Sequence, residues 1–279
     1  MGPTALVAVE QHFPKAQRLL EDQFARRMLP PLAQPFLWLA QFAWARNWMV
    51  RATEKDGPGF WGGMLCRKRY IDERVVASVG EMQAVVILGS GFDMRPFRIP
   101  ALSEVPVWEI DQPENIEPKR KRLRSTFGTI PANLTLFAMD FDHQDLNAAL
   151  ASHGYSIDLR TFFIWEAVTQ YITEKAVRTT FALLAASSPG SRLAFTYVRK
   201  DFLGGANLYG WERLYNRFVT TKVWIFGMNP EGWPAFLQPY GWRIVEDLGY
   251  DTLAEKYVRP TGRQLATTPV ERIIYAEKL

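Results

Sequence analysis

The sequence predicts an α/β fold: a seven-stranded, mostly parallel sheet with helices on both faces, a helical N-terminal cap and an insert after the fifth strand. From residue 84 onward, short apolar runs alternate with helical stretches, which is the pattern of βαβ units and a parallel sheet covered on both faces. The first 80 residues contain mostly helical stretches, and the alternation breaks after Val198. We therefore expect a cap in residues 1–80 and a ligand-binding domain in residues 81–279.

The cap helices are predicted at Gln17–Met28, Pro35–Arg51 and Lys68–Val79. Pro30-Pro31 separates the first two, and a glycine-rich loop at residues 56–63 precedes the third. The segment Pro35–Val50 is the most apolar, but it is too short, and too interrupted by Arg46, to span a bilayer. We expect an amphipathic helix packed on the domain. A helix at a membrane surface or in a dimer is the alternative.

The seven strands are predicted at Ala84–Leu88, Val105–Ile110, Leu134–Met139, Thr161–Trp165, Arg192–Val198, Trp242–Asp247 and Val270–Ala276. Helices fill the intervals. One of them is Glu174–Ser187, with Thr173 as its expected N-cap and Ser188-Pro189-Gly190 as its end. The segment Lys200–Tyr240 is rich in aromatic residues and glycine, and is predicted to form a lid over a substrate.

Composition limits the class of protein. With 48% hydrophobic residues the chain can bury a large core, and its formal net charge of +4 is small. The basic run from Lys119 to Arg124 is best interpreted as a solvated helix, because no nucleic-acid-binding motif accompanies it. Cys66 is the only cysteine, which excludes an intrachain disulfide and a cysteine-based zinc cluster. Met1–Phe13 lacks the pattern of a secretory signal, so we expect a cytoplasmic protein without a metal.

The first strand ends at Gly89-Ser90-Gly91, and Asp111 ends the second. An apolar strand followed by Gly-x-Gly is typical of a tight turn in which the backbone approaches a ligand. The carboxylate of Asp111 can accept hydrogen bonds from ribose hydroxyls. The dinucleotide fingerprint requires a third small residue, but the chain has Met94 there. These features predict a nucleoside-containing cofactor and favour S-adenosylmethionine, which has no phosphates, over a pyrophosphate cofactor.

Polar residues also follow the other strands, at the edge where open α/β sheets bind ligands. Gln112 follows Asp111, and Glu166 follows the very apolar fourth strand. A carboxylate in that position predicts a ligand contact or an ion pair, because an unpaired buried charge is costly. Glu109 is the second candidate for the ribose, after Asp111.

The third strand is followed by Asp140-Phe141-Asp142. Asp140 can accept a hydrogen bond from an adenine amino group, and Phe141 can offer its backbone or ring to the base. Turn formation is the alternative role for Asp140 and Asp142, because Asp is common at such corners.

Several separated motifs together resemble one family. They are Val86–Arg95, Glu109–Pro113, Asp140-Phe141, Trp165–Thr173 and the basic segment Cys66–Asp72. The set resembles the leucine carboxyl methyltransferase type of class I, Rossmann-like, S-adenosylmethionine-dependent methyltransferases, and its bacterial branch in particular. The resemblance implies that residues 81–279 bind S-adenosylmethionine and that the protein transfers its methyl group.

The predicted cofactor-binding residues are Arg67, Gly89, Ser90, Gly91, Asp111, Gln112, Asp140, Phe141 and Glu166. The resemblance implies that Arg67 holds the methionine carboxylate, for which a planar guanidinium is well suited. It places the two glycines against the methionine moiety, Asp111 on the ribose and Glu166 near the methionine amino group. Lys68 stands where bacterial members commonly have threonine, so Arg69 remains an alternative to Arg67.

The scarcity of histidine bears on the methyl acceptor. His12, His143 and His153 all lie away from the predicted strand ends. A phenol or an alcohol benefits from a base that removes its proton, whereas a carboxylate is already ionised at neutral pH and needs only alignment. We therefore expect carboxyl O-methylation of a small molecule without a catalytic base. Tyr171 could assist a hydroxyl acceptor, which is the alternative.

The residues expected to contact the acceptor are Arg69, Tyr171, Tyr197, Trp224 and Trp233. Two other classes of protein remain possible. A nicotinamide-dependent oxidoreductase would use the same glycine turn, and Tyr171-x-x-x-Lys175 has the spacing of a reductase pair. A non-catalytic binding module would keep the fold without the pocket. A monomer or homodimer with no nucleic-acid partner fits all of these interpretations.

Overall fold

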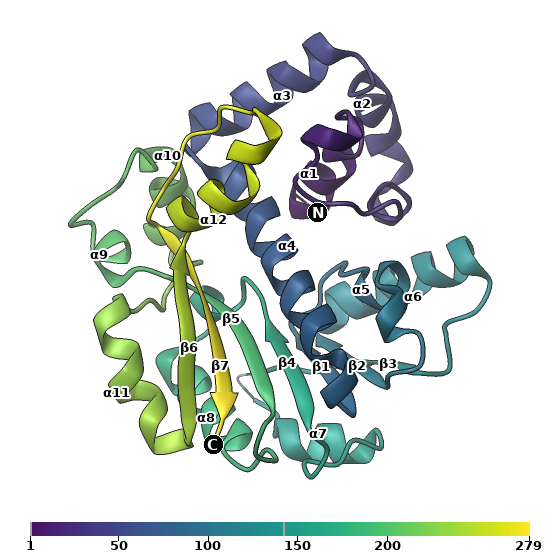
Figure 1. The fold of residues 1–279 in the computed structure, drawn as a ribbon, viewed down its shortest axis with the longest axis vertical. Coiled ribbons are helices and arrows are strands. Elements are labelled where there is room, and N and C mark those ends of the chain that lie inside the picture. The colour runs from purple at the N-terminus through teal and green to yellow at the C-terminus, as the bar shows by residue number, and fades with distance from the viewer. Residues whose placement is uncertain (1, 142) are drawn as a thin grey trace.

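The computed structural model describes residues 2–141 and 143–279, and its centre is one seven-stranded sheet (Figure 1). The strands are β1 Ala84–Leu88, β2 Val107–Asp111, β3 Leu134–Ala138, β4 Thr161–Trp165, β5 Arg192–Val198, β6 Trp242–Gly249 and β7 Glu271–Lys278. Their order in the sheet is β3-β2-β1-β4-β5-β7-β6, and β7 alone is antiparallel to its neighbours. The predicted fold class is confirmed. The boundaries of β1, β4 and β5 match the prediction, and the others differ by one or two residues.

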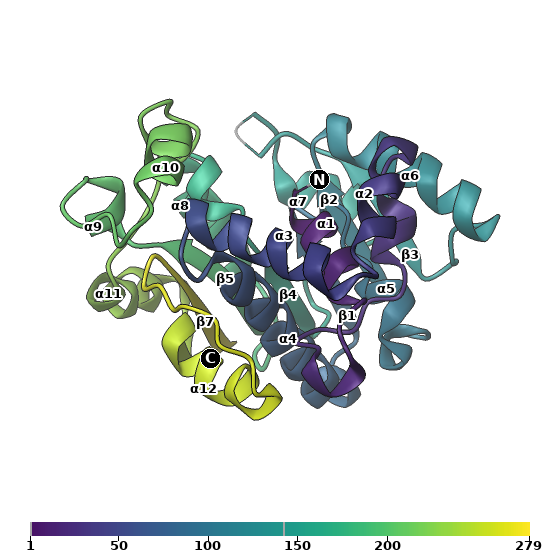
Figure 2. The same ribbon diagram turned by 90° about the horizontal axis from the view of Figure 1, so that it is seen from above.

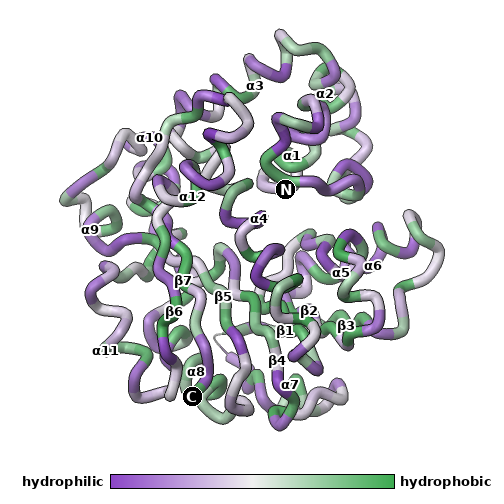
Figure 3. The backbone as a smooth tube through the Cα atoms, viewed as in Figure 1, coloured by the Kyte–Doolittle hydropathy of each residue, from purple (hydrophilic) through white to green (hydrophobic). Residues whose placement is uncertain are grey.

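Helices cover both faces of the sheet. They are α1 Gly2–Glu10, α2 Gln34–Leu39, α3 Ala43–Asp56, α4 Phe60–Ser78, α5 Arg95–Arg98, α6 Pro113–Phe127, α7 Leu146–Ser152, α8 Glu174–Leu184, α9 Lys200–Leu203, α10 Glu212–Leu214, α11 Trp233–Leu237 and α12 Tyr250–Tyr257. Strand residues alternate between two hydrophobic clusters: Val85 and Ile87 pack with α4, α6 and α12, and Val86 and Leu88 pack with α7, α8 and α11. Figure 3 shows how hydrophobic these central strands are.

The first predicted cap helix is wrong. Residues 17–28 contain no α-helix; they form an irregular segment that ends in the 3₁₀ turn Ala25–Met28. The carboxylate of Asp22 accepts hydrogen bonds from the backbone N–H groups of Phe24 and Ala25, both at 3.0 Å. A side chain that captures nearby N–H groups in this way competes with helix formation.

The second predicted cap helix is interrupted, and the third begins earlier than predicted. The buried guanidinium of Arg46 donates to the carbonyl oxygen of Ala40 at 3.2 Å, in the break between α2 and α3. The predicted glycine-rich loop at residues 56–63 ends at Gly59, which has φ of 80°, and α4 starts at Phe60. Within α4, position 62 is glycine because a Cβ atom there would lie 1.8 Å from the hydroxyl of Tyr250.

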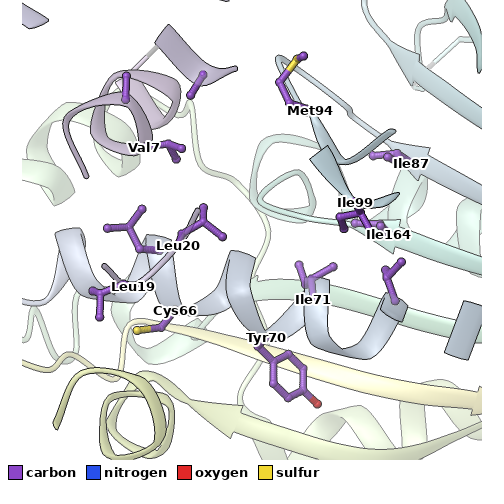
Figure 4. Packing of buried hydrophobic residues seen from close by; sticks show 14 of the residues in the cluster. Val7, Leu19, Leu20, Cys66, Tyr70, Ile71, Ile87, Met94, Ile99 and Ile164 are labelled. Carbon is purple, nitrogen blue, oxygen red and sulfur yellow. The ribbon is translucent and has the colours of Figure 1, made fainter. Parts of the chain in front are cut away.

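The cap and the sheet share one hydrophobic cluster. Figure 4 shows the continuity from Val7 of α1, through Leu19 and Leu20, to Ile71 of α4 and Ile164 of β4. The fully buried carboxylate of Glu10 fastens the end of α1 to its surroundings. It accepts hydrogen bonds from the Leu19 N–H at 2.8 Å and the Trp61 indole at 3.0 Å, and it pairs with Arg263. The cap therefore packs as a continuation of the sheet's own core.

The predicted insert after β5 contains α9, α10 and α11 joined by turns and loops (Figure 2). Its aromatic residues pack in two different hydrophobic clusters. Trp211 and Trp224 belong to a small cluster with Phe202, whereas Trp233 is fully buried against the sheet. Among the described residues, no helix is both long and apolar enough to cross a membrane.

The basic helix α6 is less solvated than expected. Lys119 and its ion-pair partner Glu109 of β2 are both fully buried, and Arg122 lies over the ring of Phe92. Burial raises the pKa of Glu109 to about 7, although Lys119 opposes the shift. The stability of the protein should therefore fall if either partner is removed alone.

Replacing Lys119 with Met should lower the free energy of unfolding at pH 8 by about 3–5 kcal/mol, because the Glu109 carboxylate would be buried without a cation. The double variant Glu109→Gln/Lys119→Met should recover most of that loss. Urea denaturation of the three proteins measures both effects. A single variant as stable as the double variant would show that the pair does not contribute as an ion pair.

Candidate functional site

A cavity of about 420 Å³ lies at the carboxyl ends of β1, β2 and β4. In Figure 1 this edge of the sheet faces the cap helices, and residues of α1 and α4 form part of the cavity wall. Eight of the nine predicted cofactor-binding residues line it: Arg67, Gly89, Ser90, Gly91, Asp111, Gln112, Phe141 and Glu166. The volume falls within the roughly 300–1,000 Å³ of small-molecule pockets.

The glycine turn after β1 forms the floor of the cavity. Gly89 has φ of 71°, and a Cβ atom there would lie 2.2 Å from the side chain of Val168. Gly91 has φ of 49° and nothing within 4 Å of a Cβ position, so its open side faces free space. Between them, the buried hydroxyl of Ser90 has no hydrogen-bond partner among the described residues. The turn thus offers a ligand a close backbone approach and one unused hydroxyl group.

Asp111 connects this turn to the end of β2. One carboxylate oxygen accepts from the Gly91 N–H at 2.5 Å, and the other accepts from the Gln112 N–H at 2.7 Å and the Asn115 amide at 2.8 Å. These three donors fix the carboxylate at the cavity wall. Each oxygen can accept more than one hydrogen bond, so the carboxylate retains capacity for a ligand hydroxyl. Asn115 also lines the cavity, and no sequence motif singled it out.

Glu109, the second candidate for the ribose, does not line the cavity. It lies two residues earlier on β2, beneath α6, where Lys119 pairs with it. Asp140 is also outside the lining residues. Its carboxylate lies 2.9 Å from Nδ1 of His143, and nearly half of its side chain is exposed. Asp142 lies outside the described residues.

Glu166 occupies a buried cluster of cations beside the turn. Its carboxylate lies 3.0 Å from Nε of Arg67, 3.0 Å from Nζ of Lys68 and 2.9 Å from Nη2 of Arg95. Burial alone would raise the pKa of Glu166, but the three cations outweigh burial and hold the pKa well below its usual range. The carboxylate therefore stays ionised at neutral pH.

Arg67 and Arg69 have different surroundings, although they are two residues apart on α4. Arg67 lines the cavity, and its Nε and Nη1 atoms pair with Glu166 and Glu271. Its remaining nitrogen, Nη2, has no hydrogen-bond partner among the described residues. Arg69 pairs with Glu73 at 3.3 Å and lies over the ring of Tyr257, in a separate polar hollow. Of the two arginines, the structure brings Arg67 to the cavity.

Arg95 is a central residue of this cluster to which sequence reasoning gave no role. Its guanidinium is fully buried and pairs with Asp72 of α4, Asp93 of the glycine turn and Glu166. Burial would raise the pKa of Asp93, but Arg95 and the cations around it lower it. Asp72, Asp93 and Arg95 all lie inside the motifs that resemble the family, and this was the only sequence signal that they belong to the site. The sequence does not show that they pair with one another, because the fold brings them together.

The five residues expected to contact the acceptor do not form one group. Tyr171 lines the cavity and is 45% exposed. Trp224 packs edge-on against Tyr171, with ring centroids 6.2 Å apart, but it is itself buried. Tyr197 and Trp233 are fully buried in the core and, like Arg69, do not line the cavity. The hydroxyl of Tyr197 donates to Asp247 at 2.8 Å.

The strand order, the single antiparallel strand and the acidic strand end beside a glycine turn define a class I, Rossmann-like methyltransferase. Comparison with known proteins gives the family. The family model described as leucine carboxyl methyltransferase matches residues 1–185. The chain belongs to this family.

Curated relatives agree with this assignment. Over 252 residues the chain is 31% identical to a Mycobacterium tuberculosis protein provisionally named an S-adenosyl-L-methionine-dependent methyltransferase; the match covers 82% of this chain and 78% of the relative. A Mycobacteroides abscessus protein with the same name is 26% identical over 82% of this chain and 77% of its own. The protein is therefore an S-adenosylmethionine-dependent methyltransferase, and the interpretation as a nicotinamide-dependent oxidoreductase is not supported.

Solved structures share the fold. A methyltransferase-like protein from Thermobifida fusca has a TM-score of 0.59 at 17% identity, covering 90% of this chain and 96% of its own. A DUF574 family protein from Streptomyces avermitilis has a TM-score of 0.59 at 14% identity, covering 84% of this chain and 91% of its own.

Replacing Glu166 with Gln should lower the free energy of unfolding at pH 7 by about 3 kcal/mol, because three buried cations lose a shared anion. The folded pKa of Glu166 lies below the unfolded value, so its contribution is present above about pH 4 and is lost as the pH falls through the folded pKa. The difference between the two proteins should therefore stay constant down to about pH 5 and shrink below about pH 4. Denaturant titrations across that range measure it, and a difference that persists unchanged at low pH would contradict this account.

Proposed function

We propose that the protein methylates the carboxylate of a small molecule. The observation that carries the proposal is the chemistry of the cavity wall: its described lining residues include no histidine, and the carboxylates of Glu166 and Asp93 have pKa values below their usual range. Carboxylates of this kind are weak bases. Asp22 also lines the cavity, and burial raises its pKa, but its carboxylate already accepts from the N–H groups of Phe24 and Ala25 and lies 3.6 Å from Nε of Arg98. An acceptor that is already ionised at neutral pH suits such a site, because it needs alignment and no proton removal.

The residues around the cavity fit S-adenosylmethionine, whose sulfonium group supplies the methyl. We propose that the free Ser90 hydroxyl and the open side of Gly91 face its methionine part, and that Asp111 accepts hydrogen bonds from its ribose. Arg67 would hold its carboxylate with the nitrogen that Glu166 and Glu271 leave unused. Glu166 would lie near its amino group, and Phe141 near the adenine.

The acceptor side of the site is proposed to lie where the insert meets the turn Thr169–Tyr171. The backbone N–H of Ile225 donates to the carbonyl oxygen of Gln170 at 2.8 Å, which joins the two segments. Val223 and Ile225 expose 42% and 47% of their surface beside this junction, and Tyr171 continues it into the cavity. This apolar rim suits an acceptor whose carboxylate is attached to an apolar or aromatic body. The insert would then act as the substrate lid.

Methylation of a hydroxyl group is the second candidate function, because the half-exposed Tyr171 lines the cavity and could assist such an acceptor. Carboxylic acids and phenols incubated with methyl-labelled cofactor distinguish the two. A carboxylate acceptor yields a methyl ester that mild alkali hydrolyses, whereas a hydroxyl acceptor yields an ether that survives. Label found only in alkali-stable products would reject carboxyl methylation.

Replacing Arg67 with Lys should weaken S-adenosylmethionine binding about tenfold, because the one nitrogen of lysine cannot contact Glu166, Glu271 and the cofactor carboxylate as three separate guanidinium nitrogens can. Arg69→Lys is the matched control, since Arg69 lies in a separate hollow. Isothermal titration of both variants measures the effect. Equal affinities would remove Arg67 from the cofactor site, and weaker binding in the Arg69 variant alone would reverse the assignment.

Replacing Ile225 with Asp should raise the KM for a carboxylate acceptor about fivefold, because a charge on the rim repels the acceptor by about 1 kcal/mol at close range in water. The affinity for the cofactor should not change. Val245→Asp is the control, because Val245 is equally exposed (46%) but lies on β6, away from the rim. Steady-state kinetics with an acceptor from the screen gives both constants. If the two variants show the same KM, the acceptor does not pass this rim.

A further inference from the structure

The outer surface of the cap carries an unusual concentration of exposed apolar side chains. Thirteen large hydrophobic residues are exposed in the described chain, and seven of them fall between residues 32 and 48. Leu32 is 93% exposed, Trp44 70%, Trp48 62% and Trp38 54%. We call the seven residues the α2–α3 patch; they are Leu32, Phe36, Trp38, Leu39, Phe42, Trp44 and Trp48. Apolar groups gathered in this way mark an interaction surface, whereas isolated ones do not.

No other segment of the described chain covers the patch. On α3 the opposite face, which includes Ala45, Met49 and Val50, is already buried in the cap. Trp44, Trp48, Arg51 and Lys55 follow one another at helical spacing on the exposed side. In Figure 2, which views the molecule from above, α3 crosses the outside of the cap. The helix is thus amphipathic, with tryptophan and cations on its outward side.

The charges around the patch are mostly positive, and the acidic residues nearest to it on α3 are already engaged: Glu54 accepts from the Gly59 and Trp61 N–H groups, and Asp56 pairs with Arg213. From residue 23 to residue 53 the sequence contains four arginines and no acidic residue. Arg46 is buried, whereas Arg26, Arg27 and Arg51 are exposed. A surface that combines exposed tryptophans with unopposed cations is complementary to an anionic lipid surface. Indole rings settle at the headgroup level, and each cation near the surface gains from the negative potential.

We propose that the α2–α3 patch docks the protein on anionic lipid bilayers, with α3 lying in the plane of the interface. The cap then stands between the lipid and the catalytic edge of the sheet: α2 contacts α1, and Pro3, Thr4 and Val7 of α1 line the cofactor cavity. This inference does not depend on the identity of the methyl acceptor, because docking and methyl transfer are separate events.

Flotation with vesicles tests the proposal. The protein should float with vesicles of mixed phosphatidylglycerol and phosphatidylcholine, and only weakly with pure phosphatidylcholine. Trp44→Ser/Trp48→Ser should lower the partition coefficient about tenfold or more, because the buried apolar area is lost. Arg51→Gln/Lys55→Gln should lower it about fivefold for each charge, and only on the anionic vesicles. Raising the salt concentration should reproduce the effect of the charge variant in the wild type.

The matched control is Val76→Ser/Val245→Ser, which removes two exposed apolar side chains elsewhere on the surface and should bind as the wild type does. All the substituted side chains are exposed, so the variants should fold as the wild type does. Circular dichroism checks that each variant is folded. The proposal is overturned if the wild type fails to float, or if the tryptophan variant floats equally well. Sedimentation velocity tests whether a second copy of the chain binds the patch instead. If the wild type does not bind vesicles but forms a dimer that the tryptophan variant abolishes, the patch is a dimer contact and the lipid proposal is wrong.

Discussion

The buried carboxylate of Glu166 is the interaction on which the site depends. Three cations from two parts of the chain converge on it: Arg67 and Lys68 from α4, and Arg95 from the segment after the glycine turn. Charges buried to this extent persist only when each has a partner, so the positions of α4 and the turn are coupled. Because α4 also connects the cap to the sheet, this single anion fixes one wall of the cavity relative to its floor.

The coupling joins the cap to the cavity. The hydrophobic cluster that begins on the sheet continues through α4 to α1, and α1 contributes directly to the cavity wall. Glu10 fastens α1 at its far end through Trp61 and Arg263, which lie far apart in the sequence. A change in the cap would therefore alter the cofactor cavity through packing as well as through direct contact.

The two proposed sides of the site differ physically. The proposed cofactor side consists of a glycine turn and carboxylates at strand ends. The proposed acceptor side is an apolar rim, where the backbone N–H groups of Ile225 and Phe226 both donate to the carbonyl oxygen of Gln170. Apolar surfaces discriminate weakly between similar ligands, so shape and charge at this rim would select the acceptor.

The sequence by itself determined the sheet, the glycine turn and the position of Asp111, because strand periodicity and turn chemistry are local properties. Only the tertiary structure decided which residues line the cavity. It separated Arg67 from Arg69, paired Glu109 with Lys119 and placed Tyr197 and Trp233 in the core. The pairing of charges and the burial of aromatic rings depend on segments distant in the chain. The breaks in the cap helices have a different cause: Asp22 and Arg46 bind backbone groups two to six residues away, and hydrophobic periodicity does not reveal such local side-chain hydrogen bonds.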